Sequence, residues 1–233
     1  LIDKSDIIEL GIDNDSTLGD EFCATLGFPL MAREFLKQYN INIQDKNIYG
    51  VEWHERLSKF AYMNGKIVPW AEAQVHVFSP VVRYAAAVFE SILGFWDGEN
   101  VNMFRLDDHL DRLTYAQKMM RFTTHVEGVK ESIIELVQAN EFKEDVAVRP
   151  MVYLGGESPG GAIGATGPAS LAITVFPKPP SKLMETGCIA QVSSWTRISD
   201  SSMPARIKST ANYHNGRLAE MQSKLEGYDS CIL

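Results

Sequence analysis

The alternation of apolar and polar residues after about residue 58 predicts short strands separated by amphipathic helices. Asn64-Gly65 lies between apolar residues and favours a tight β-hairpin, because both central residues of such a turn adopt positive φ. Leu106–Met120 and Val126–Phe142 repeat apolar residues at helical spacing. Val146–Leu154 and Ser170–Phe176 are mostly apolar, which predicts strands buried on both faces. The pattern therefore predicts a mixed α/β fold.

Shorter segments complete the predicted order of elements. Val75–Phe78 is interpreted as a strand in which His76 has a structural role, and Tyr84–Leu93 as a helix followed by a strand. The glycine-rich segment Gly155–Gly167 follows a strand without opening a helix, so we expect a surface loop and not a phosphate-binding loop. Pro177–Pro180 is a stiff break, which predicts a domain boundary.

Three regions follow from this pattern. Residues 59–176 are predicted to form a small α/β domain, residues 177–182 a linker, and residues 183–233 the start of a β-rich domain. Residues 1–52 differ from the rest of the chain in their pattern of polar and apolar residues, and they weakly resemble the later part of a carrier protein. The serine that carries phosphopantetheine in such a domain is missing, so this segment is expected to be a short helical leader without a working carrier site.

Composition narrows the classes of function. The net charge of −8 argues against nucleic acid or an anionic membrane as partner. The three cysteines are scattered and odd in number, which favours neither a disulfide framework nor a metal site. No apolar run is long enough to span a bilayer, so a cytoplasmic enzyme is expected. The chain begins with Leu1, and Cys231–Leu233 resembles the opening of a buried strand, as expected of a piece of a longer protein.

The rest of the chain is organised around Lys208, at the point where a polar loop gives way to a helix. Ser209 or Thr210 is expected to cap this helix by accepting a backbone N–H. An apolar stripe follows at helical spacing: Leu218, Met221 and Leu225. Gly227 is a natural end of the helix.

Lys208-Ser-Thr-Ala-Asn-Tyr213 resembles the sequence signature of the fold-type IV pyridoxal-phosphate enzymes, and among them the branched-chain aminotransferases. The resemblance covers residues 59–233 and implies that Lys208 binds pyridoxal 5′-phosphate covalently as a Schiff base. It also implies that Tyr213 hydrogen-bonds the cofactor's phenolic oxygen. His109–Leu113 matches a "His-Leu-x-Arg-Leu" pattern, which implies that Arg112 binds the phosphate. A planar, permanently charged guanidinium suits phosphate oxygens.

The same resemblance implies that Tyr84, Phe89 and Arg149 bind the substrate, with Arg149 receiving the distal carboxylate of glutamate or 2-oxoglutarate. The chain also departs from the family pattern. Ala147 stands where a tyrosine is usual. In addition, "Phe-Glu-Gly-Ile-Arg" reads Phe89-Glu-Ser-Ile-Leu93, so a glycine and an arginine are replaced. These changes are expected to reshape the substrate pocket.

The expected function is transamination between a branched-chain or similarly apolar L-amino acid and 2-oxoglutarate, by a homodimer. Two parts of the family's site, a carboxylate for the pyridine nitrogen and a phosphate-binding loop, would come after Leu233, so this segment alone is expected to be poorly active. Aminodeoxychorismate lyase is an alternative. A D-amino acid aminotransferase is disfavoured because Arg149-Pro-Met151 lacks the histidine of that group. A third alternative is an impaired, carrier-linked interaction protein.

Overall fold

The computed structural model describes residues 58–123, 126–156, 164, 167–178, 180–181 and 183–233. The predicted leader over residues 1–52 lies outside these residues, as does most of the glycine-rich loop Gly155–Gly167.

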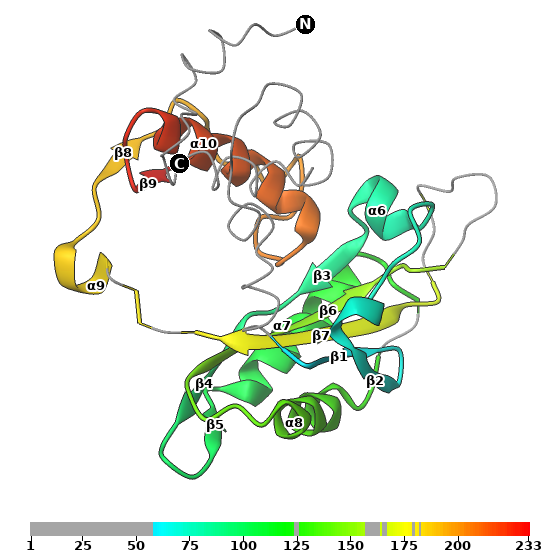
Figure 1. Cartoon of the computed structure of the whole chain (residues 1–233). Coiled ribbons are helices and arrows are strands. Elements are labelled where there is room, and N and C mark those ends of the chain that lie inside the picture. The colour runs from blue at the N-terminus through cyan, green and yellow to red at the C-terminus, as the bar shows by residue number, and fades with distance from the viewer. Residues whose placement is uncertain (1–57, 124–125, 157–163, 165–166, 179, 182) are drawn as a thin grey trace, which may run out of the picture. The chain divides into compact units, whose positions relative to one another are not determined.

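In this part of the chain the main sheet has seven strands in the order β2-β1-β7-β6-β4-β5, with β3 pairing against β6 beside this path (Figure 1). All of its paired neighbours are antiparallel. The strands are β1 (Phe60–Met63), β2 (Lys66–Pro69), β3 (Ala87–Phe89), β4 (Ile92–Trp96), β5 (Val101–Met103), β6 (Val146–Tyr153) and β7 (Ser170–Pro177).

The predicted hairpin is confirmed, and its turn is tied to the sheet. Asn64 and Gly65 both have positive φ, 49° and 90°, in the link between β1 and β2. The Leu171 N–H donates to Asn64 Oδ1 at 3.0 Å, and the Asn64 N–H donates to the Leu171 carbonyl at 2.8 Å. The side chain of the turn therefore also fixes the position of β1 against β7.

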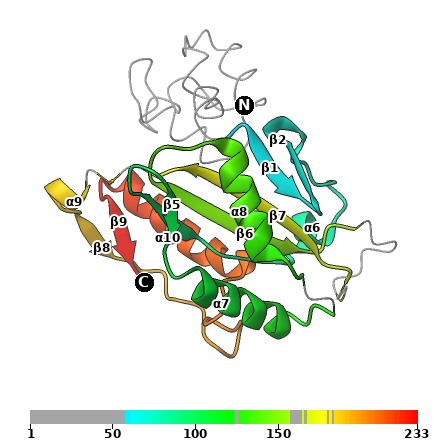
Figure 2. The same ribbon diagram turned by 90° about the horizontal axis from the view of Figure 1, so that it is seen from below.

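Both predicted amphipathic helices are confirmed as α7 (Leu106–Met119) and α8 (Val129–Asn140). They pack against one face of the main sheet (Figure 2). The buried core between these layers contains side chains from both helices and from four strands: Val88, Ile92, Leu113, Ile133, Leu136, Val146, Val148, Val152, Ile173 and Val175. Burial of this apolar surface is the main source of stability for such a layered fold.

A second sheet follows the proline-rich break. Its two parallel strands are β8 (Ala190–Val192) and β9 (Ser230–Ile232), joined by a connection that contains α10 (Tyr213–Leu225). Four short helices complete the described elements: η1 (Trp70–Glu72), α6 (Pro80–Tyr84), α9 (Leu183–Thr186) and η2 (Thr210–Asn212). β7 ends at Pro177 and the next strand belongs to the other sheet, while the division into two domains stays a prediction.

The predicted strand at Val75–Phe78 is wrong, because Val75 and His76 have no regular secondary structure and Val77 and Phe78 lie in a turn. The Phe78 N–H donates to His76 Nδ1 at 3.1 Å, and the Ser79 N–H donates to the His76 carbonyl at 3.0 Å. These local hydrogen bonds satisfy the backbone without a neighbouring strand. The helix before β3 is α6, which ends at Tyr84, where the prediction had it begin.

The start and the apolar stripe of α10 also differ from the prediction. The N-cap residue of α10 is Asn212, without a capping side-chain hydrogen bond. Ser209 is the N-cap residue of the short helix η2, but its side chain makes no capping hydrogen bond either. On α10 the fully buried side chains are small or polar, Ala219 and Ser223, whereas Leu225 in the predicted stripe is 65% exposed. The Ser223 hydroxyl accepts a hydrogen bond from the Gln191 side chain on β8, so the buried face of α10 is not its most apolar one.

Within the described residues no helix has both the length and the apolar character needed to cross a bilayer. The same residues contain no group of three or more His, Cys, Asp or Glu side chains arranged to hold a metal ion.

The position of α8 on the sheet generates a testable prediction about Asn140, which is buried at the last turn of the helix. Its Oδ1 accepts from the backbone N–H groups of Lys59 and Phe60 at 2.8 and 3.1 Å, and its Nδ2 donates to Phe60 and Leu136 carbonyls. Asn140→Ala should lower the free energy of unfolding by about 2–3 kcal/mol, because several backbone groups lose their partner.

Urea denaturation monitored by circular dichroism measures this change. The matched control is Gln138→Ala, at an exposed position of the same helix, which should shift the free energy of unfolding by less than about 0.5 kcal/mol. Equal effects of the two substitutions would show that Asn140 does not anchor the helix.

Candidate active site

The backbone around Lys208 is attached to β3. The Phe89 N–H donates to the Lys208 carbonyl at 3.0 Å, and Ser209 forms a β-bridge with Val88. The Thr210 hydroxyl donates to the carbonyls of Ala85, just before β3, and Ala87, the first residue of that strand. Thr210 therefore holds the chain against β3 in place of the capping role predicted for it.

The Lys208 amine lies beside a pair of aromatic rings, Phe89 and Tyr213. Its Nζ donates a hydrogen bond to the Tyr213 hydroxyl at 2.7 Å. The same Nζ lies 4.9 Å from the centre of the Phe89 ring and 5.3 Å from that of Tyr213. The two rings are themselves in contact, with centroids 5.1 Å apart. The structure thus brings together three of the predicted site residues, from β3, the loop and α10.

Arg112 on α7 pairs with Glu90, whose side chain is completely buried. Its Nε and Nη2 donate to the two carboxylate oxygens at 2.5 and 2.6 Å, and His109 Nδ1 lies 3.0 Å from Oε2. Burial raises the pKa of the Glu90 carboxyl. Hydrogen bonds and positive charge from Arg112 and His109 outweigh burial and hold that pKa below its ordinary value. The carboxylate is therefore ionised at neutral pH.

The Arg112 guanidinium also lies within electrostatic reach of the lysine cluster. Its hydrogen bond with Glu90 raises the pKa of Arg112 above its ordinary value, and the charge interaction with Tyr213 adds to the rise. Arg112 and Tyr213 lie on different helices, α7 and α10, and the predicted roles of both residues in cofactor binding stay predictions.

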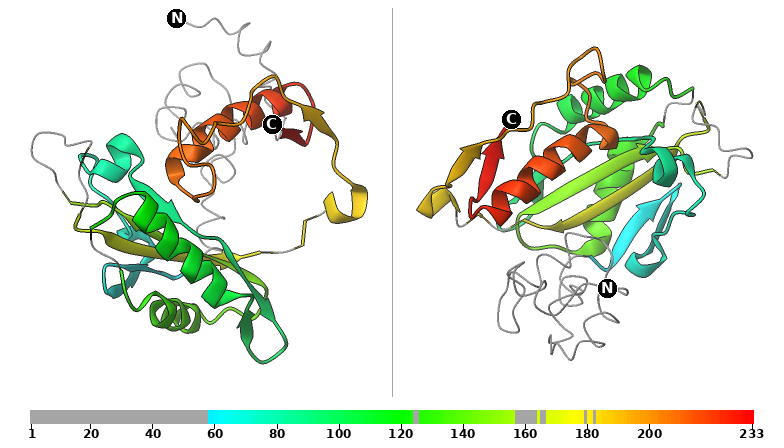
Figure 3. Two further views of the ribbon diagram at one scale, coloured as in Figure 1. Left: turned by 180° about the vertical axis from the view of Figure 1, so that it is seen from behind. Right: turned by 90° about the horizontal axis from the view of Figure 1, so that it is seen from above.

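The register of the sheet places the predicted substrate residues on one face. Phe89 pairs with Met151 and Leu93 with Ala147, and alternate residues of β6 share a face, so Arg149 lies on the same side. This face is opposite to the core packed by α7 and α8, which contains Val148 and Val152. Figure 3 shows α10 on the side of the sheet away from α8.

Arg149 is exposed on this face, and its guanidinium carbon lies 4.8 Å from the centre of the Phe176 ring on β7. Its neighbour two residues earlier, Ala147, is buried between Leu93 and Phe176 in the register. Tyr84 is the last residue of α6 and its ring lies 5.0 Å from the Arg83 guanidinium. The structure thus places Tyr84 at the end of α6, and its role in substrate binding stays a prediction.

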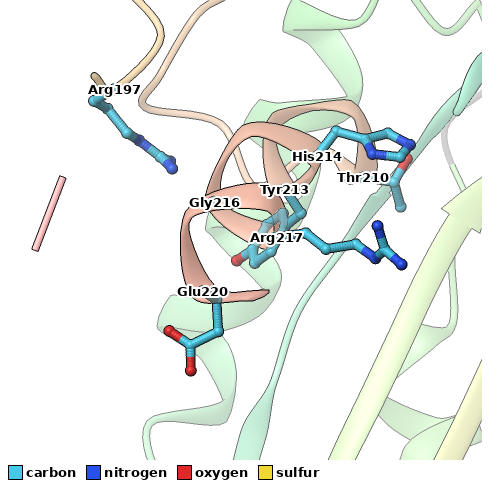
Figure 4. A pocket seen from close by; sticks show the side chains of 7 residues that line it. All are labelled: Arg197, Thr210, Tyr213, His214, Gly216, Arg217 and Glu220. Atoms are coloured by element: carbon cyan, nitrogen blue, oxygen red, sulfur yellow. The ribbon is translucent and has the colours of Figure 1, made fainter. Parts of the chain in front are cut away.

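A cavity of about 590 Å³ lies beside α10 (Figure 4). Figure 4 shows Arg197 reaching toward the helix from a separate loop. The lining residues are Arg197, Thr210, Tyr213, His214, Gly216, Arg217 and Glu220. Of the predicted site residues, Tyr213 is the one that lines it, so this cavity borders the lysine cluster without containing it.

Glu90 is the site residue that sequence reasoning missed. It stands within the Phe89–Leu93 motif, yet no role was predicted for it. The available signal was a carboxylate inside the otherwise largely apolar stretch Ala85–Leu93, because a charge in such a stretch is retained only where it has partners.

The residues present fit a phosphorylated pyridoxal group. The amine of Lys208 has a hydroxyl partner and aromatic neighbours, as required of an amine that must stay in place beside a flat ring. A guanidinium that suits phosphate lies within electrostatic reach of that hydroxyl. Together these groups offer a covalent attachment point, a hydrogen-bond partner for a ring oxygen and a cation for a phosphate.

Comparisons with known proteins point to one family. The profile of the family described as "Amino-transferase class IV" matches residues 87–233. A probable branched-chain-amino-acid aminotransferase of Aquifex aeolicus is 32% identical over 181 residues, covering 75% of this chain and 57% of the relative. The branched-chain-amino-acid aminotransferase of Escherichia coli K12 is 27% identical over 178 residues, covering 74% and 57%. The chain thus spans little more than half the length of these curated relatives.

Solved structures that resemble this chain point to the same family. The branched-chain aminotransferase of Thermoproteus uzoniensis with norvaline has 35% identity and a TM-score of 0.69, covering 76% of this chain and 59% of that one. The branched-chain amino acid aminotransferase of Thermobaculum terrenum in its PLP form has 32% identity and a TM-score of 0.62, covering 76% and 58%. Because the family profile matches residues 87–233, more than half of the chain, and the Aquifex relative is 32% identical over 75% of it, the chain belongs to the class IV aminotransferases.

Proposed function

We propose that the protein carrying this chain catalyses transamination between a branched-chain or similarly apolar L-amino acid and 2-oxoglutarate, with pyridoxal 5′-phosphate as cofactor. The observation that carries the proposal is the position of the Lys208 amine, 2.7 Å from the Tyr213 hydroxyl and beside the Phe89 ring, in a class IV aminotransferase. When bound, the cofactor supplies an electron sink for the negative charge that develops at the substrate Cα.

Lys208 is proposed to hold the cofactor and to move the proton. A general base must reach the proton that it removes, and the attachment of the lysine backbone to β3 limits where Nζ can go. The Tyr213 hydroxyl gives Nζ a hydrogen-bonding partner at one defined position. Once the amino group of the substrate has displaced it, the free, unprotonated amine of Lys208 would take the proton from the substrate Cα and then, as an acid, deliver it to C4′ of the cofactor.

Arg112 is proposed to bind the cofactor phosphate. Its guanidinium stays charged, because Glu90 raises its pKa further, and a charged fork donates two parallel hydrogen bonds to phosphate oxygens. Lys208 and Arg112 would then hold the cofactor at its two ends. Such two-point binding orients the ring relative to the lysine.

The substrate is proposed to lie against the sheet face that carries Phe89, Leu93 and Arg149. Phe89 and Leu93 offer apolar surface to an aliphatic side chain, and Leu93 is 38% exposed. Arg149 offers a charge-assisted hydrogen bond to the second carboxylate of glutamate or 2-oxoglutarate. One face would therefore serve both substrates through different groups.

Covalent cofactor binding is tested by borohydride reduction of the full-length protein followed by peptide mapping. The label should lie on Lys208, and Lys208→Ala should abolish both labelling and transamination. Lys224→Ala, at an exposed position of α10, is the matched control and should retain both. Label on another lysine in the unsubstituted protein would refute the assignment.

The role of Arg149 is tested by measuring the two half-reactions separately. Arg149→Ala should slow the reaction with glutamate much more than the reaction with leucine, because only glutamate has a second carboxylate that can accept a charge-assisted hydrogen bond from the guanidinium. Arg105→Ala, in an exposed ion pair with Asp108, is the control and should change neither half-reaction. Equal slowing of both half-reactions would mean that Arg149 contacts a group common to the two substrates, or acts structurally.

We also propose that the full-length protein is a homodimer, as the resemblance to fold-type IV enzymes implies. The segment around α6 supports the proposal, since Val77, Phe78 and Val82 are exposed apolar side chains close together in sequence. Sedimentation velocity of the full-length protein should give the mass of a dimer at micromolar concentration. A monomer under these conditions would contradict the proposal.

A further inference from the structure

Glu90 is a buried charge that has no role in the proposed reaction. Its side chain is 0% exposed, and its backbone N–H donates to the Pro150 carbonyl at 2.9 Å. Burial of an ionised carboxylate is costly unless it is paired and hydrogen-bonded. Glu90 therefore depends on its partners, and the identity of those partners indicates what the charge does.

The contacts of Glu90 fix one edge of the Arg112 guanidinium. Nε donates to Oε1 at 2.5 Å and Nη2 to Oε2 at 2.6 Å, so two parallel hydrogen bonds set both the position and the plane of the group. His109 Nδ1 lies 3.0 Å from Oε2 and 3.3 Å from Arg112 Nη2. Because an ionised carboxylate only accepts, Nδ1 donates to Glu90 and has no lone pair for the arginine.

The opposite edge of the guanidinium remains available. Within the described part of the chain, Arg112 Nη1 has no hydrogen-bond partner, and the Arg112 side chain is half-exposed. Glu90 thus occupies the Nε side of the group and leaves the Nη1 side for a second anion. An arginine without such a partner would sample many rotamers, and ordering it on binding would cost free energy.

The neighbour of Glu90 in sequence connects this arrangement to Lys208. Phe89 contacts the Lys208 amine with its ring and the Lys208 carbonyl with its N–H. Successive side chains of extended chain point to opposite faces, so Phe89 meets the lysine cluster while Glu90 meets α7. One dipeptide therefore sets the position of the lysine and of the arginine relative to each other.

We propose that Glu90 is a positioning residue, which holds Arg112 by its Nε–Nη2 edge and presents the Nη1 edge to the phosphate of the cofactor attached at Lys208. This inference rests on the proposed function, since it takes pyridoxal 5′-phosphate as the cofactor. It adds that the strength of phosphate binding depends on a residue that does not touch the phosphate.

The test compares two probes, pyridoxal 5′-phosphate and pyridoxal, which differ by the phosphate alone. Dissociation constants of both are measured by absorbance titration of the full-length apoprotein. Glu90→Gln should weaken the binding of pyridoxal 5′-phosphate by about tenfold or more, the loss expected when a charge-assisted hydrogen bond is removed, and leave pyridoxal unchanged within about twofold. A purely structural effect would weaken both probes equally and would overturn the proposal.

Arg112→Ala supplies the reference and Asp108→Asn the matched control. Arg112→Ala should show the same selective loss, and the double variant should lose no more than Arg112→Ala alone, because Glu90 acts through the arginine. Asp108→Asn breaks the exposed pair with Arg105 on the same helix and should change neither probe. Additive losses in the double variant would overturn the proposal.

The outcomes separate this inference from the proposed function. If Arg112→Ala is selective but Glu90→Gln is not, the positioning role fails while the phosphate role of Arg112 stands. If Arg112→Ala is not selective, the phosphate role fails and the inference with it. Should Glu90→Gln not fold, as judged by circular dichroism, Glu90→Asp keeps the charge but shortens the side chain, so it should still reduce phosphate selectivity. Unchanged selectivity in Glu90→Asp would overturn the proposal.

Discussion

The attachment of the Lys208 segment to β3 is the constraint on which the site depends. A hydrogen bond from the Phe89 N–H to the Lys208 carbonyl and the bridge between Val88 and Ser209 join parts of the chain that are far apart in sequence. The Thr210 hydroxyl strengthens this junction through the carbonyls of Ala85 and Ala87. Through this contact the loop before α10 shares the rigidity of the main sheet, so the amine stays in a narrow range of positions.

The two faces of the main sheet have different roles. Its face toward α7 and α8 is filled with aliphatic side chains and supplies the core, whereas its other face carries Phe89, Arg149 and Phe176. Glu90 is the exception on the core side, since it is a charge among apolar residues. Its pairing with Arg112 and His109 compensates for its burial and connects the core of the fold to the site.

Two departures from the family pattern, Leu93 and Ala147, lie on the sheet face that carries Phe89 and Arg149. Leu93 and Ala147 are directly opposite each other in adjacent strands, and Ala147 pairs in turn with Phe176. Ala147 is small, so the surface around it is formed mainly by the side chains of Leu93 and Phe176. The family pattern has an arginine at the position of Leu93 and a tyrosine at that of Ala147, so this part of the face is less polar than the pattern implies.

The sequence by itself determined the elements whose pattern is local. The Asn64-Gly65 hairpin, the helices α7 and α8 and the buried strands β6 and β7 follow from turn chemistry and periodicity, and the motif around Lys208 sufficed for the family. The run Val75–Phe78 shows the limit of such reasoning, because an apolar segment becomes a strand only where a partner edge is available. Only the tertiary structure decided that Thr210 binds the carbonyls before β3 instead of capping a helix, and that Glu90 holds Arg112. Both depend on contacts between residues distant in the chain, whose partners no local pattern specifies.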